Sequence, residues 1–500
     1  VFAYSYQRLS TAEKASFCQL AIFNSRFDVG AAQTVAIASE ATLDLLVSHS
    51  LLKVNPTDEG LTKRYEMHRL LRQFALEQLV IEHELKEELE TRYIDYFIDF
   101  LDQRGEGLRQ GGPTSLFTEV EVYIDDIREV WQRLILILAV SANDRWIKAE
   151  QSLEALCNFY FAKGWIAEGL ELVEKLASLD HGSTFSLRSA LWQAEFEAGL
   201  GNYPTADSVF KNVLIRSQQT GSRLVELEAL NGLGRVKYLQ GDMETAEKLF
   251  QEGLDLARYE EDPISISLAL NCLANTIAEA YMDYDKSIFF LAESLDISRA
   301  AGDQLGTARA LINLGAVAQE RNQLKEAQDL YQQSLDLYQT IGYQHGIAAA
   351  LNYLGQIAIK KEDFTVAREL LKQSINLYLT NGDQRGEADV LRQMGNIARG
   401  QRKVEEALTH YEDALAIAQT IGGDLLGLAV LLEVAELHKI EGKPDVAAQV
   451  ATQILDHPAV GDEVATLARR LLTDIKPCQT KDLVDSDLTL GQMVEIALAA

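Results

Sequence analysis

Residues 302–341 read GDQLGTARALINLGAVAQERNQLKEAQDLYQQSLDLYQTI, and this stretch decides the fold. The same pattern is written five times between Asn231 and Lys443, about 40 residues apart. Small residues at fixed positions allow the two helices of one unit, and the next unit, to approach closely. Such units cannot bury their apolar faces alone, so they stack into a superhelix with a long concave surface. The sequence therefore predicts a protein that is mainly a binding surface.

The composition fits a long helical protein rather than one compact core. Five hundred residues predict two or more domains or a solenoid, and an apolar fraction of 47% with seven prolines favours long folded helices. The formal net charge is −29, and residues 1–80 contain equal numbers of acids and bases, so the remainder carries the whole excess. Such a field repels nucleic acid and anionic lipid surfaces, which makes nucleic acid an unexpected partner.

The cysteines and the apolar runs point to a cytoplasmic protein. The cysteines are scattered and lack metal-ligand spacing, which favours a reduced setting; they are Cys18, Cys157, Cys272 and Cys478. The longest apolar stretch, Leu134 to Val140, is too short to span a bilayer, so no membrane partner is expected. The chain opens at Val1 in what reads as the middle of a domain, and we expect it to be an excised fragment.

Residues 1–80 predict a winged helix with three to four helices and a β-hairpin. Ser10 and Glu13 have the spacing of a capping box, which starts a helix. Further helices are expected over about Asp28 to Ala38, over Leu43 to His49, and from His68 to about Leu79. Two short strands, Leu51 to Val54 and Lys63 to Met67, flank a turn-rich loop.

The remaining residues predict a mainly α chain in three further parts. Residues 81–180 are helical without a clean repeat and read as a linker or arm with degenerate repeats. Residues 181–473 form a superhelix of about seven helix pairs, whose terminal units are atypical because one face lacks a neighbour. Residues 474–500 form a polar tail that ends in a short amphipathic helix.

The repeat resembles the tetratricopeptide repeat in its long-helix form. Five pairs occupy the place of that family's Leu-Gly pair: Leu233-Gly234, Leu273-Ala274, Leu314-Gly315, Leu354-Gly355 and Met394-Gly395. The second helices match the family through Ala246, Ala327, Ala367 and Ala407, each followed four residues later by Phe250, Tyr331, Leu371 or Tyr411. The resemblance implies an α-solenoid that binds protein or peptide.

The rest of the chain resembles the part of STAND (NB-ARC-type) signal-transduction ATPases that follows their nucleotide-binding domain. The matching stretches include Tyr4 to Tyr6, Phe17 to Phe23, Leu45 to Leu52, Tyr65 to Arg72, Asp125 to Arg128, Gly164 to Gly169 and Leu488 to Val494. The resemblance implies a sensor: a protein or peptide effector, or a small molecule, binds the concave groove and relieves autoinhibition. The upstream nucleotide-binding domain, the second expected partner, would then exchange its nucleotide and oligomerise.

This chain lacks the catalytic part of that family. No Gly-x-x-x-x-Gly-Lys-Ser/Thr motif occurs, so no enzyme activity is expected within the chain, and ATP or ADP is expected only with the upstream domain. By the resemblance His68 is the nucleotide-sensing histidine, although Arg69 stands where the family has an acid. On residue type alone, His68 is as readily a hairpin-packing or capping residue. The dispersed histidines and cysteines predict no metal site.

Polar residues recur on the first helix of each unit and mark the candidate groove. Two positions four residues apart point the same way on a helix. They hold Asn231 and Arg235, Asn271 and Asn275, Asn352 and Gln356, and Arg392 and Asn396, with Arg309 from the intervening unit. Asn and Arg suit hydrogen bonds to an extended peptide backbone or a carboxylate. Ordinary solvated positions, or Asn ladders between repeats, remain the alternative interpretation.

Two other functions compete with the sensor hypothesis. One is a plain tetratricopeptide scaffold for protein assembly. The other is a DNA-binding transcriptional regulator that uses the winged helix, against which the helix from His68 to Leu79 carries few bases, Arg69 and Arg72. The sequence leaves open the identity of the effector, the downstream output and the oligomeric state.

Overall fold

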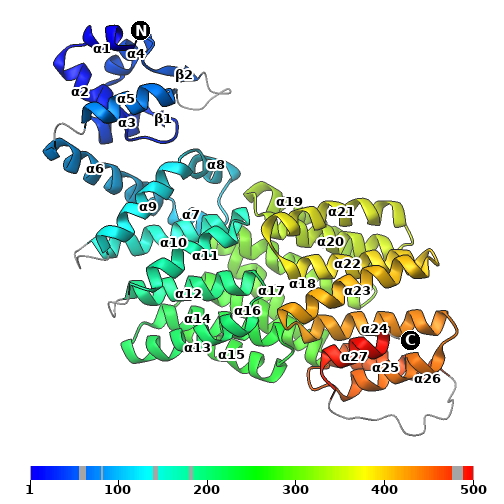
Figure 1. Cartoon of the computed structure of the whole chain (residues 1–500). Coiled ribbons are helices and arrows are strands. Elements are labelled where there is room, and N and C mark those ends of the chain that lie inside the picture. Colours follow the sequence, from blue (N-terminus) through cyan, green and yellow to red (C-terminus); the bar gives the residue numbers. More distant parts are fainter. Residues whose placement is uncertain are drawn as a thin grey trace. The chain divides into compact units, whose positions relative to one another are not determined.

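A computed structural model describes residues 2–55, 63–79, 83–138, 145–179, 184–475 and 488–498. The described chain is almost entirely helical, as the sequence predicts (Figure 1). It divides into two compact units. The first unit contains residues 1–109 and 113–159, and the second contains residues 110–112 and 160–500. The four-part division drawn from the sequence remains a prediction.

The first unit begins with short helices and a small antiparallel sheet. Its elements are α1 (Phe2–Gln7), α2 (Thr11–Leu20), β1 (Phe27–Asp28), α3 (Val29–Ala36), α4 (Glu40–Ser48), β2 (Lys53–Asn55), β3 (Arg64–Glu66) and α5 (Arg69–Leu79). Both halves of the expected capping box at Ser10 and Glu13 are present. The sheet order is β1-β3-β2, with Phe27 opposite Tyr65 and Val54 opposite Tyr65 from the other side. Strand β1 was absent from the sequence prediction because its two residues show no alternation, and residues 56–62 of the expected loop lie outside the described residues.

Longer helices complete the first unit and share its core. They are α6 (His83–Asp102), α7 (Gly105–Arg109), α8 (Thr114–Val122), α9 (Ile124–Leu138) and α10 (Arg145–Lys163), whose last residues belong to the second unit. The ring of Phe23 lies edge-on to Tyr93 of α6 at 5.9 Å and stacks on Phe27 at 4.7 Å. Edge and offset ring contacts of this kind stabilise a core beyond area burial. The N-terminal elements and α6 therefore form one packed body.

A buried carboxylate, Asp126 of α9, ties α9 to the loop before β1. Its side chain is 0% exposed and accepts hydrogen bonds from the backbone N–H of Asn24 at 2.6 Å and of Ser25 at 2.9 Å. The hydroxyl of Tyr93 donates a third bond at 2.7 Å. Burial raises the pKa of Asp126, and these three donors oppose that shift. The carboxylate is tolerated inside because its acceptors are satisfied.

Replacing Asp126 with alanine is expected to loosen this junction strongly. Asp126→Ala leaves the two amides without an acceptor and leaves the Tyr93 hydroxyl only its longer contact, at 3.4 Å, with the carbonyl oxygen of residue 126. This loss costs roughly 3 kcal/mol. Hydrogen exchange at the Asn24 and Ser25 amides of the full chain measures the opening. The matched control is Asp125→Ala, because Asp125 is exposed and only pairs with Arg128 at 3.0 Å. Equal exchange in both variants would show that Asp126 does not hold the loop.

The second unit is a succession of antiparallel helix pairs (Figure 1). Its helices are α11 (Ile166–Ala177), α12 (Thr184–Gly199), α13 (Tyr203–Thr220), α14 (Arg223–Leu239), α15 (Met243–Tyr259), α16 (Pro263–Tyr281), α17 (Tyr284–Ala301), α18 (Gln304–Glu320), α19 (Leu324–Ile341), α20 (Gln344–Lys360), α21 (Phe364–Asn381), α22 (Gln384–Gly400), α23 (Val404–Ile421), α24 (Asp424–Ile440), α25 (Pro444–Asp456), α26 (Asp462–Asp474) and α27 (Leu490–Leu498). The Gly-Asp dipeptides of the sequence mark the joints. Gly302 ends α17 with a φ of +71°, and Asp303 then caps α18 by accepting the Gly306 N–H at 2.8 Å.

Within a pair, a small residue of the first helix receives a large side chain of the second. A Cβ atom at Gly395 would lie 2.3 Å from the ring of Tyr411, and one at Gly315 would lie 2.6 Å from Tyr331. These rings are fully buried. In two units the partner is the smaller leucine. Gly355 keeps the glycine there, and a Cβ would lie 2.8 Å from Leu371. Ala274 replaces the glycine beside Leu291.

We expect the glycine and the ring to be energetically coupled. Gly395→Ala forces Tyr411 to move and is expected to lower the free energy of unfolding by about 1–2 kcal/mol, although alanine favours a helix. Tyr411→Leu provides the space that Leu291 leaves for Ala274. In urea denaturation, the loss in free energy of unfolding of the double variant should therefore be about 1 kcal/mol smaller than the sum of the two single losses. Additive losses would contradict this packing rule.

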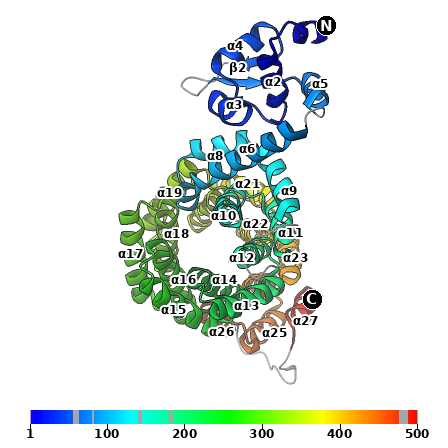
Figure 2. The same cartoon turned by 90° about the vertical axis from the view of Figure 1, so that its left-hand side faces the viewer.

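The pairs wind around a central axis, with α14, α16 and α18 on the inner side and α13, α15 and α17 outside (Figure 2).

One turn of the superhelix contacts the next turn. A Cβ at Gly201 would lie 2.8 Å from Ile421, and one at Gly241 would lie 2.8 Å from Ala459. Ile421 belongs to the same buried cluster as Leu187 and other residues of α12 to α14, although they lie far apart in the sequence. These contacts hold the inner helices of the two turns around one interior.

The last repeat is covered by α27. Leu490 and Met493 of α27 are buried and belong to the same cluster as the side chains of α24 and α25. Gly427 leaves room for Leu490, since a Cβ there would lie 2.6 Å from it. Nε2 of His438 lies 2.8 Å from the Ala497 carbonyl oxygen near the end of α27. The terminal apolar face is thus shielded, as stacked repeats require.

Candidate functional site

A polar cavity of about 400 Å³ lies inside the second unit. It is lined almost entirely by the inner helices of the superhelix (Figure 2). The lining residues are Tyr238, Asn275, Ala278, Glu279, Tyr284, Asn313, Ala316, Val317, Gln319, Glu320, His345, Ala349, Asn352, Tyr353, Gln356, Tyr378, Asp383, Arg385, Gly386, Asp389, Arg392 and Leu426. Its size falls within the usual range of ligand pockets, and its lining has more polar and charged groups than most.

The cavity runs obliquely across the helices. Tyr238, Glu279 and Glu320 come from the last turns of α14, α16 and α18. His345 and Arg385 are the second residues of α20 and α22. Helices α14, α16 and α18 therefore present their C-terminal ends to the cavity, α20 presents most of its length, and α22 presents its N-terminal half.

Asp389 is the centre of a hydrogen-bonded cluster on the cavity wall. Its Oδ1 accepts from Nε of Arg392 at 3.1 Å and from Nη2 at 2.8 Å, and its Oδ2 accepts from Nδ2 of Asn352. Burial alone would raise the pKa of Asp389, but Arg392 and the Asn352 amide outweigh burial and hold it below its usual range. Asp389 is therefore ionised, and both of its carboxylate oxygens accept hydrogen bonds.

Asp383 is satisfied in a similar way. Nε2 of His345 lies 2.8 Å from its Oδ2, and the Gly386 N–H donates to its Oδ1 at 2.8 Å. Burial opposes ionisation, while the bond to His345 and the helix amide lower the pKa of Asp383. Its position as the N-cap of α22 is one where negative charge is favoured.

Glu279 and Arg385 are less well satisfied. Glu279 accepts a hydrogen bond from the Tyr238 hydroxyl, and burial raises its pKa against the opposing effects of Tyr238 and Arg385. Nη1 of Arg385 and Oδ1 of Asn352 are both buried without a hydrogen-bond partner in the described structure. Unfilled donors and acceptors in one cavity mark a place where a ligand gains hydrogen bonds.

The raised pKa of Glu279 predicts a specific pH dependence of stability. Because the folded state holds this proton more tightly than the unfolded state, Glu279 lowers stability as pH rises from its unfolded value of 4.5 through its folded pKa. Glu279→Gln keeps the acceptor for Tyr238 and removes the charge. The variant should melt at a higher temperature than the parent at pH 7, and the difference should vanish below pH 4.5.

The control for this prediction is an exposed pair of the same chemistry. The Tyr281 hydroxyl donates to Glu247 at 2.7 Å on the outside of the unit. Glu247→Gln should therefore leave the melting temperature nearly unchanged at both pH values. A Glu279→Gln variant that melts below the parent at pH 7 would contradict the assignment of Glu279 as an unfavourably buried acid.

The structure brings four of the residues expected in the groove into this cavity. They are Asn275, Asn352, Gln356 and Arg392. Oε1 of Gln356 accepts from Nε2 of Gln319 at 3.2 Å, so polar side chains of neighbouring repeats contact each other along the wall. This contact is also the Asn- or Gln-ladder arrangement that the alternative interpretation foresaw, and the binding role of these residues remains a prediction.

The other expected groove residues lie elsewhere. Asn231 and Asn271 are 2% and 3% exposed between helices, where Asn271 bonds Ser294 and the Ser267 carbonyl. Their positions face the partner helix because the groove-facing stripe does not run parallel to the helix axis. Asn313 donates to Oδ1 of Asn271 at 3.1 Å, which links this buried pair toward the cavity wall.

Arg235, Arg309 and Asn396 are held by neighbours outside the residues that line the cavity. Arg235 forms an ion pair with Glu195 of the preceding repeat. Arg309 lies beside the rings of Tyr338 and Tyr343. Asn396 accepts from the Tyr411 hydroxyl at 2.7 Å.

Sequence reasoning missed Glu279, His345, Tyr353 and Arg385. They lie three, four or seven residues from expected positions, on the same helical stripe. Extending the stripe by up to two turns would have identified them. Their convergence from different repeats depends on the curvature of the superhelix, which the repeat pattern alone does not define.

His68 lies in the first unit, on the surface at the start of α5. Its Nδ1 accepts the N–H of Leu70 at 3.3 Å, a contact expected of a capping residue. Among the described residues, no group of three His, Cys, Asp or Glu side chains is arranged to hold a metal ion. In the same part of the chain, the search for a membrane-crossing helix finds no candidate of sufficient length and apolar character.

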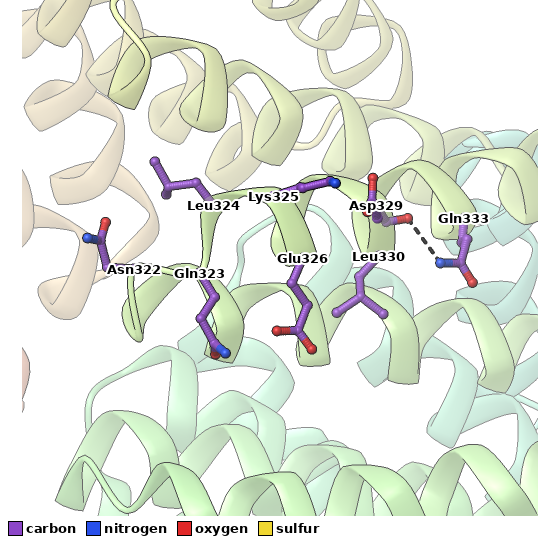
Figure 3. Close-up of a pocket in the computed structure, with 8 residues that line it drawn as sticks. All are labelled: Asn322, Gln323, Leu324, Lys325, Glu326, Asp329, Leu330 and Gln333. Atoms are coloured by element: carbon purple, nitrogen blue, oxygen red, sulfur yellow. Dashed lines mark hydrogen bonds between the residues drawn. The ribbon is translucent and has the colours of Figure 1, made fainter.

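A second hollow of about 610 Å³ follows the outer side of α19 (Figure 3). Its lining belongs to α19 and the turn before it: Asn322, Gln323, Leu324, Lys325, Glu326, Asp329, Leu330 and Gln333. The labelled side chains point to different sides of the helix rather than toward a common point (Figure 3). This hollow therefore lacks the converging polar groups of the inner cavity.

Comparison with known proteins identifies the repeats. The tetratricopeptide repeat family matches residues 186–258, 265–340 and 386–457. The chain therefore contains tetratricopeptide repeats. Residues 344–381, between two of the matched stretches, form α20 and α21 with the same pairing. No curated protein is significantly similar to the chain.

Three solved structures are similar to the chain at low identity, and the first of them shares its fold. A Rap protein in complex with Competence and Sporulation Factor is 13% identical, with 77% of this chain and 97% of that chain covered and a TM-score of 0.52. A STAND protein with a tetratricopeptide repeat sensor from Pyrococcus horikoshii is 16% identical, with 84% and 64% covered and a TM-score of 0.42. NprR in complex with its cognate peptide NprX is 13% identical, with 65% and 88% covered and a TM-score of 0.46.

Proposed function

We propose that the second unit is the sensor of a STAND-type signalling protein and binds a peptide effector in its inner cavity. The observation that carries this proposal is the cavity itself, in which polar groups from several repeats converge and two of them lack a hydrogen-bond partner. Structural polar groups inside a protein are normally satisfied, so an incomplete set in a cavity favours a ligand. No catalytic step is part of this proposal.

The chemistry of the wall suits an extended peptide. Asn275 and Gln356 each offer one donor group and one acceptor group, which matches the alternating N–H and C=O groups of a backbone. Arg392 is already paired with Asp389, so its role is to fix the wall rather than to bind charge. The ring of Tyr353 lines the same space and supplies apolar contact area.

The proposed output is a change in the superhelix. The cavity is lined by helices from α14 to α24, so one ligand contacts repeats on both superhelical turns. A ligand shifts an equilibrium between two arrangements only through different contacts in each. We propose that the bound arrangement relieves autoinhibition of an upstream nucleotide-binding domain, with α2 to α5 and the sheet acting as a winged helix. If the ligand is instead a permanent protein partner, the chain is a scaffold.

Peptide selection tests the proposal directly. A synthetic library of random heptapeptides with free termini is selected by affinity on the full chain, and the affinities of the selected peptides are measured by calorimetry. The double variant Asn275→Ala/Gln356→Ala loses two backbone hydrogen bonds and should weaken binding by about tenfold or more. Both side chains are partly exposed, so the fold should be retained.

The matched control carries the same residue types on the outer surface. Asn376→Ala/Gln373→Ala changes exposed residues of α21 and should leave affinity unchanged. Failure to select any peptide, or equal affinities for the two double variants, would overturn the proposed site.

A further inference from the structure

We infer that the cavity recognises a zwitterionic ligand, with a cationic amine at Glu279 and a carboxylate at Arg385. This inference rests on the proposed function and specifies its ligand class. A free amino acid and a short peptide with free termini share this chemistry. An internal segment of a larger protein does not carry it in its backbone.

The first observation is the electrical asymmetry of the cavity. Glu279 and Glu320 lie in the last turns of α16 and α18, where the helix dipole already places negative charge. Acids are unfavourable at that end of a helix. Glu320 has a distant partner in Lys360 at 3.9 Å, whereas no ion pair to Glu279 is formed within the described residues. This wall therefore attracts a cation.

The N-terminal half of α22 offers an unfilled donor to the same cavity. Arg385 is in the first turn of α22, at the positive end of the helix dipole. Two acids of the cavity lining near Arg385 in sequence are already engaged. Asp389 accepts hydrogen bonds from Arg392 and Asn352. Asp383 is bonded to His345 and to the Gly386 amide. Arg385 forms no ion pair with a carboxylate in the described structure, and its Nη1 is buried without a partner. A ligand carboxylate would supply the missing acceptor.

A second, independent observation concerns Asn352. This side chain is 3% exposed, it lines the cavity, and its Oδ1 lacks a partner while its Nδ2 is fixed on Asp389. Because the amide is held at one end, its open end is an acceptor rather than a donor. It can accept an N–H of the ligand beside the carboxylate that Arg385 binds. Donor and acceptor thus stand together, as recognition of an amino-acid-like group requires.

Glu279 and Arg385 also influence each other. The Arg385 guanidinium lowers the pKa of Glu279, although no ion pair joins them. A direct internal ion pair would need no ligand, so the separation between these charges is what leaves room for one. The cost of keeping the two charges apart inside the protein is offset when a ligand of opposite polarity lies between them.

The test uses three forms of one probe set with the full chain. Tripeptides of the type Gly-X-Gly, with X varied over all residues, are prepared with free termini, with an acetylated N-terminus, and with an amidated C-terminus. The free amino acids form a fourth set. We expect binding by the free-termini tripeptides or the free amino acids, measured by calorimetry, with about a tenfold or greater loss on capping either end.

Variants assign each end of the ligand. Glu279→Gln should weaken binding of the tripeptides with free termini and should not change binding of those with an acetylated N-terminus. Arg385→Gln should also weaken binding of the tripeptides with free termini and should not change binding of those with an amidated C-terminus. Glu247→Gln, on the exposed pair with Tyr281, is the matched control and should change neither. If Arg385→Gln fails to fold, the capping series on the unmodified chain and Glu279→Gln still decide the question.

The outcomes distinguish a failure of this inference from a failure of the proposed function. Capped and free probes that bind equally would overturn it, as would unchanged affinities in Glu279→Gln. If no probe binds while selected heptapeptides bind equally well with both ends capped, the zwitterion assignment fails and the proposed function stands. If neither experiment yields a ligand, both fail.

Discussion

The contact between a glycine of one helix and a ring of its partner is the constraint on which this structure depends. At Gly395 and Gly315 the first helix has no side chain, and the rings of Tyr411 and Tyr331 occupy that space. The two helices of a pair can then approach closely along one face. Because a small residue faces a larger side chain at the same position in each unit, the angle between pairs repeats, and a repeated angle produces a superhelix.

The curvature of the superhelix creates an interior, and contacts between its two turns enclose that interior. Ile421 and Ala459 touch the turns at Gly201 and Gly241, so the second superhelical turn packs against the first. Inner helices that are far apart in the sequence then face one space. A binding site assembled in this way combines groups from many repeats, and it responds as a whole when the pitch of the superhelix changes.

The electrostatics of the interior follow from the same geometry. Helices α14, α16 and α18 expose their C-terminal ends to the cavity and α22 exposes its N-terminal half, so helix ends of opposite dipole sign border the same space. Glu279 and Arg385 strengthen this asymmetry, while Asp389 and Arg392 neutralise each other. The cavity is therefore electrostatically polar, and this polarity is needed to distinguish the two ends of a small ligand.

The sequence by itself determined the repeat, its helical character and the positions of its small residues, because capping residues, glycines and the periodicity of apolar residues act over a few residues. It also placed Asn275, Asn352, Gln356 and Arg392 on the inner stripe. Only the tertiary structure decided which polar residues converge. Asn231 and Asn271 are buried between helices because the groove crosses the helices obliquely. Arg385 and Glu279 influence each other because the superhelical pitch brings together repeats that are remote in sequence. In the first unit, likewise, no local pattern could have joined Asp126 to Asn24, since that contact depends on how two distant segments pack.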